Sequence, residues 1–137
     1  MPRLAKIVCL MLVAGFLVAA HAQNLDDTHA YFANAIYQRN AGEIHRGQPQ
    51  ALLRAVVVLH VKLDETGHWL AEVVRENDQQ PEMTRKALAS VAALEPVRDM
   101  SEDIRAVMRT VGFTEVWLFQ NDGHFALRSL ALPQLSR

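Results

Sequence analysis

Histidine side chains are the residues of this sequence whose chemistry is considered first. Five of the six histidines follow an N-terminal apolar segment: His29, His45, His60, His68 and His124. His60 and His68 lie on either side of a predicted hairpin turn, beside Asp64, where two imidazoles could approach one another and bind zinc or copper. However, no pair has H-x-x-x-H spacing, and no cysteine outside the apolar segment can supply a thiolate. We therefore expect scattered surface histidines, with no metal and no other cofactor.

Catalytic groups do not form a recognisable pattern. There is no G-x-S-x-G motif, and none of the serines is adjacent to a histidine. Glu72 and Glu76 could pair with Asp64 as an acid/base couple, but charges on the solvent face of a strand explain them more simply. We expect a protein that is not an enzyme.

The first 22 residues have the three parts of a secretory signal peptide. Arg3 and Lys6 precede an uninterrupted apolar run at residues 7–20, and Ala20-His21-Ala22 places small residues where signal peptidase cleaves. The run is shorter than the roughly 20 residues of a membrane-spanning helix, and an uncleaved anchor is the alternative interpretation. We predict cleavage after Ala22, a periplasmic location, no stable membrane span and one domain over residues 23–137.

Charge and cysteine content limit the partners and the means of stabilisation. The chain has 14 Lys and Arg against 15 Asp and Glu, without the clustered basic face that nucleic acid requires. The only cysteine, Cys9, lies in the apolar run, so the exported domain must fold without a disulfide. We expect no nucleic acid partner.

The first half of the domain predicts a helix followed by a hairpin. Apolar residues at helical spacing around Phe32 and Ile36 predict a helix, with Asp26, Asp27 and Thr28 as candidate N-caps. Apolar residues then alternate with polar ones along one strand, which predicts a single buried face: Val57, Leu59, Val61 and Leu63. The turn at residues 64–67 returns the chain as an antiparallel strand over residues 68–77.

The second half predicts two helices and a second hairpin. Asn77 or Asp78 is expected to cap a helix that has Pro81 in its first turn, and Ser101 is expected to cap a shorter helix that ends at Gly112. Two strand-like segments flank Asn121-Asp122-Gly123, a strong hairpin signal. The order α-β-β-α-α-β-β predicts an α+β, two-layer fold, with helices packed on one face of a small antiparallel sheet.

Three stretches of this sequence together resemble the C-terminal domain of the TonB/TolA family, the periplasmic ends of envelope energy transducers. They are VVVLHVKLDETGHWLAEVVREN, PEMTRKALASVAALEP and FTEVWLF, and the preceding helix AYFANAIYQRN is more similar to the TolA branch. The family domain has the same order of strand, glycine turn, strand, alanine-rich helix, proline and third strand. This chain departs from it in several ways: Leu94-Glu95-Pro96 lacks the usual aromatic residue, residues 97–112 add a helix, and the second hairpin beyond Asn121 is longer. We also expect neither the transmembrane anchor nor the long proline-rich segment of the family.

The resemblance implies a stand-alone, non-catalytic periplasmic module of the cell envelope, associated with transport. Such a module binds an extended segment of an outer-membrane or envelope protein as an added strand at its sheet edge. The resemblance places the partner-binding edge strand on Phe113, Thr114, Glu115, Val116, Trp117, Leu118 and Phe119. A secondary edge is expected on His124, Phe125, Ala126, Leu127 and Arg128.

Strands joined by a tight turn usually pair, which leaves alternatives at this edge. The last strand could fill the edge, become the edge itself, or be exchanged with a second copy in a homodimer. The alternative function is therefore a self-associating, strand-exchanged envelope protein, followed by a periplasmic metal-binding protein.

Overall fold

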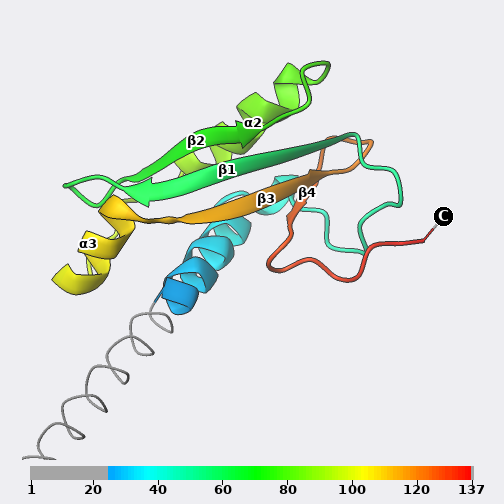
Figure 1. Ribbon diagram of the computed structural model, residues 1–137. Coiled ribbons are helices and arrows are strands. Elements are labelled where there is room, and N and C mark those ends of the chain that lie inside the picture. Colours follow the sequence, from blue (N-terminus) through cyan, green and yellow to red (C-terminus); the bar gives the residue numbers. More distant parts are fainter. Residues whose placement is uncertain (1–24, 137) are drawn as a thin grey trace, which may run out of the picture.

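The protein is a four-stranded antiparallel sheet with helices packed on one face (Figure 1). The computed structural model describes residues 25–136, and the predicted signal peptide lies outside them. An N-terminal helix at residues 25–39 and a 3-10 turn, η1 (Ala41–Glu43), precede the other elements. These are β1 (Ala55–Leu63), β2 (Trp69–Arg75), α2 (Pro81–Ala92), α3 (Glu102–Thr110), β3 (Phe113–Phe119) and β4 (Phe125–Leu127). The predicted fold class and element order are confirmed. No helix among the described residues has the length and apolar character needed to cross a membrane.

The strands are ordered β2-β1-β3-β4 across the sheet. Each hairpin turn contains a glycine at positive φ, Gly67 and Gly123, both at 86°. Burial alternates along all nine residues of β1, as the sequence pattern predicts, because its odd-numbered side chains face the helices. β1 pairs with both β2 and β3, so the pairing of β1 with β3 joins the two hairpins into one sheet.

The core lies between the sheet and two helices. Phe32 and Ile36 of the N-terminal helix are fully buried, and Phe32 packs against the rings of Trp69 and Trp117. Ser90 of α2 accepts a hydrogen bond at 3.0 Å from Nε1 of Trp117, which fixes α2 on the same face. The predicted caps of the N-terminal helix are wrong: residues 26–28 lie within the helix, which already includes Leu25 packed against the core.

The ends of α2 and α3 agree with most of the capping residues that the sequence predicts. Pro81 begins α2 as predicted, but the N-cap is Gln80 rather than Asn77 or Asp78, because the Asn77 carbonyl accepts from the Gln80 amide in a preceding turn. Ser101 caps α3 through its hydroxyl, and Gly112 ends it at φ 63°. As Figure 1 shows, α3 lies at the end of the sheet where β3 begins.

Candidate functional site

The strand expected to bind a partner, β3, is not an edge of the sheet. It lies between β1 and β4, and Trp117, Leu118 and Phe119 are opposite Leu127, Ala126 and Phe125. The Gln120 amide donates to the His124 carbonyl and the Arg128 amide donates to the Val116 carbonyl. These bonds show that even-numbered residues of β3 direct their backbone groups toward β4, because such groups alternate in an antiparallel ladder. β4 and the chain following it do not reach the N–H of Val116 or the backbone groups of Thr114.

Glu115 covers the Val116 amide at this edge, so that only the backbone groups of Thr114 remain uncovered. Its carboxylate accepts from the Val116 amide at 2.9 Å, from the Ser129 hydroxyl and amide, and from Nε2 of His29 at 2.7 Å. The side chain is only 2% exposed. Burial, the largest single influence, raises the pKa of Glu115, but the hydrogen bonds from His29, Ser129 and Val116 together lower it below its ordinary value. The charged carboxylate thus joins the N-terminal helix, β3 and the C-terminal segment.

The secondary edge, residues 124–128, is also occupied by the chain itself. The His45 amide donates to the Phe125 carbonyl at 2.7 Å, and Ile44 forms a parallel bridge with Phe125. The Leu127 amide donates to the Tyr37 hydroxyl at 3.0 Å. Burial of that hydroxyl is the main cause of the raised pKa of Tyr37. Both sequence-based edge assignments are therefore corrected: the last hairpin and its neighbours fill the edge that the resemblance indicated.

The opposite edge of the sheet, formed by β2, is open. The Asp64 amide donates to the His68 carbonyl, so the even-numbered residues 68, 70 and 72 direct their backbone groups toward β1. The N–H and C=O groups of Trp69, Ala71 and Val73 consequently point away from the sheet. None of these six groups has a hydrogen-bond partner within residues 25–136.

Two features limit this open edge to five residues. At one end, the Val97 amide donates to the Gly67 carbonyl at 2.9 Å and occupies the position before Trp69. At the other end, a β-bulge shifts the register, and Arg75 rather than Val74 lies opposite Val58. We call residues 69–73 the open window of β2. The window contains one charged residue, Glu72, and none of the Lys or Pro residues that usually protect sheet edges.

Apolar side chains are exposed along the open window and beside it. Leu70 is 49% exposed, Val73 is 40% exposed, and Val74 in the bulge is 62% exposed. Leu70 and Glu72 lie opposite Lys62 and His60, on the face without helices, whereas Val73 lies opposite the buried Leu59 on the helical face. A strand added here would therefore meet apolar groups on both faces.

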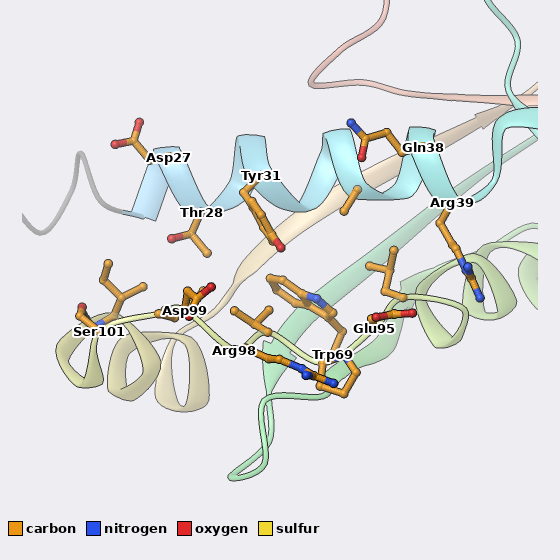
Figure 2. Close-up of a pocket in the computed structure, with 16 residues that line it drawn as sticks. Asp27, Thr28, Tyr31, Gln38, Arg39, Trp69, Glu95, Arg98, Asp99 and Ser101 are labelled. Carbon is orange, nitrogen blue, oxygen red and sulfur yellow. Dashed lines mark hydrogen bonds between the residues drawn. The ribbon is translucent and has the colours of Figure 1, made fainter.

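A groove of about 780 Å³ begins at the first residue of the window. Figure 2 shows Trp69 between the N-terminal helix on one side and the connection from α2 to α3 on the other. Tyr31 of the helix lines the groove and is 57% exposed. The Arg105 guanidinium holds the opposite wall by donating to the carbonyls of Val97 and Met100, at 3.1 Å each. Trp69 itself is only 7% exposed, so an apolar group of a bound segment would rest mainly against Tyr31.

Of the groups considered for metal binding or catalysis, Glu72 and Glu76 are exposed, and His68 lies 3.6 Å from Asp64 in the first hairpin turn. His60 contacts the Val111 carbonyl through Nε2, and His68 contacts the Thr66 hydroxyl through Nδ1. Asp64 organises the turn by accepting from the backbone amides of Thr66 and His68, and the bond from His68 is the main cause of its lowered pKa. Within residues 25–136 no three His, Cys, Asp or Glu side chains gather as a metal site would require.

Comparisons of this chain with protein-family models, with curated proteins and with solved structures gave no match. The function is therefore argued from the geometry of the open window.

Proposed function

We propose that this protein is a non-catalytic protein-binding module of the periplasm that takes up an extended partner segment at the edge of β2. The observation that supports it is the open window: its six outward backbone groups have no partner among residues 25–136, while the other edge is filled by the chain itself. Strand addition needs these groups and no special side-chain chemistry. The resemblance to TonB/TolA C-terminal domains agrees with this mode of binding, although here it moves from β3 to β2.

The backbone bonds alone would give only weak binding. Six hydrogen bonds at roughly 0.5–1.5 kcal/mol each amount to about 3–9 kcal/mol before the entropic cost of association, which is of similar size. Exposed apolar groups at Leu70, Val73 and Val74 therefore supply the remaining affinity and the selectivity. A preferred partner segment carries apolar residues on both faces, including a large one near Trp69.

Two proline variants test which edge binds. Peptides selected from a displayed random library against the wild-type protein are measured for affinity to Ala71→Pro and Thr114→Pro. Both substitutions remove an N–H that points away from the sheet, a position at which edge strands tolerate proline. One lies in the open window and the other at the uncovered end of β3.

We expect Ala71→Pro to weaken binding about tenfold or more, the equivalent of one lost hydrogen bond and its alignment. Thr114→Pro should bind as the wild type does. Binding lost with Thr114→Pro and kept with Ala71→Pro would show that β3 is the binding strand and would contradict the proposal. Circular dichroism of both variants checks that the fold is retained.

A further inference from the structure

We propose that the segment which the open window takes up is β2 of a second copy, paired antiparallel about a twofold axis at Ala71. This inference rests on the proposed function, since it names the partner of the same edge. It joins two four-stranded sheets into one continuous sheet of two copies.

The symmetry of the window supports a second copy as the occupant. Outward backbone groups are at its first, third and fifth residues, Trp69, Ala71 and Val73. Antiparallel pairing about Ala71 places Trp69 opposite Val73 of the second copy, and Ala71 opposite its own counterpart. All six outward groups of each copy are then used, in three hydrogen-bonded pairs.

Other registers between two copies are worse for identifiable reasons. A shift by two residues in one direction requires Gly67 to pair with the second copy, but the Gly67 carbonyl already accepts from the Val97 amide. A shift in the other direction requires Arg75 to pair with the second copy, but the bulge places Arg75 opposite Val58, with its backbone groups toward β1. That second shift also places Glu72 directly opposite Glu72 of the other copy, which is unfavourable for like charges.

The side chains are compatible with the register centred on Ala71. On the helical face, Val73, 40% exposed, meets Trp69 of the second copy at the beginning of its groove. On the other face, Leu70 lies opposite Glu72 of the second copy, so the two carboxylates are offset from one another. Because the window has one acidic residue and no Lys or Pro, nothing in it opposes self-pairing.

Cysteine cross-linking tests this register in the full chain with Cys9 replaced by serine. Directly opposite residues of a hydrogen-bonded pair have Cα atoms about 5.5 Å apart, within the range of a disulfide. Ala71→Cys should therefore form a disulfide-linked dimer on mild oxidation. Leu70→Cys is the matched control, because its counterpart lies diagonally, about 7–8 Å away, and should cross-link far less.

Molecular mass over a concentration series completes the test, with Ala71→Pro and Val73→Lys as two independent disruptions of the window. We expect a dimer in the wild type, monomers in both variants and cross-linking at position 71. A wild type that stays monomeric but binds selected peptides in an Ala71-dependent way would overturn the second copy and leave the proposed function intact. A dimer that persists in both variants would place self-association on another surface and overturn the inference. A monomer without Ala71-dependent peptide binding would overturn both.

Discussion

Glu115 is the residue whose substitution tests most sharply why the β3 edge is closed. Glu115→Gln keeps the shape of the side chain but removes the charge that accepts from His29, Ser129 and Val116. A hydrogen bond to a charged, buried group contributes about 1.5–3 kcal/mol, and we expect the variant to lose one such contribution. At about 4 °C per kcal/mol for a domain of this size, the Tm should fall by about 6–12 °C.

The same reasoning also predicts how the difference in Tm between wild type and Glu115→Gln changes with pH. Because the folded protein lowers the pKa of Glu115 below its ordinary value of 4.5, the charged form favours folding. This contribution is fully present above pH 4.5 and is lost as the pH falls through the lower pKa of the folded state. The difference in Tm between wild type and Glu115→Gln should therefore be greatest near neutral pH and shrink in acid.

The assay is thermal unfolding followed by circular dichroism from pH 7 down to pH 3, with Glu102→Gln as the control. Glu102 also has a lowered pKa, caused mainly by its hydrogen bond with Arg109, but it is exposed at the surface. Its removal should change the Tm little, because exposed ion pairs are screened by solvent. Equal Tm values for wild type and Glu115→Gln at neutral pH would refute the reasoning.

Three further substitutions test the packing that positions the open window. Gly112→Ala should destabilise the fold by about 2 kcal/mol or more, because φ is 63° and the new Cβ would lie 2.1 Å from the Val61 carbonyl oxygen. Urea unfolding measures the loss of stability, and Gly42→Ala, where a new Cβ meets no atom within 4 Å, is the control. Ser90→Ala should cost about 1–3 kcal/mol and alter tryptophan fluorescence, because the buried Nε1 of Trp117 loses its acceptor; an unchanged urea midpoint would contradict this. Leu118→Pro should prevent folding, since it removes a ladder donor toward Ala126, and a native circular dichroism spectrum for this variant would show that β4 does not pair there.

Local patterns predicted most elements because the forces that form them are local. The alternation in β1, the glycines at the hairpin turns, Pro81 and the Ser101 cap all act within a few residues of one another. The cap positions predicted at residues 26–28 were wrong because these residues lie within the helix, where Leu25 already packs on the core.

The order of the strands was not available from those patterns, and the candidate site depends on it. β1 and β3 pair although they are far apart in the chain, and this pairing makes β2 an edge. The resemblance makes Phe113–Phe119 the partner-binding strand, but β4 of the second hairpin pairs with it. The contact that the local pattern does not show is the bond from His29 to Glu115, which joins residues 86 positions apart. The side-chain pattern of β2 did not identify it as the edge, because apolar residues on both faces also occur in the interior strand β3.

Amide hydrogen exchange in β2 tests the central claim most directly, in protein dilute enough to be monomeric by mass. The account predicts fast exchange at Trp69, Ala71 and Val73 and slow exchange at Leu70 and Glu72, because only the latter donate toward β1. Leu118 and Leu127 should exchange slowly, since both edges of β4 are occupied. Uniform protection along β2, or fast exchange at Leu118, would contradict the assignment of β2 as the open edge.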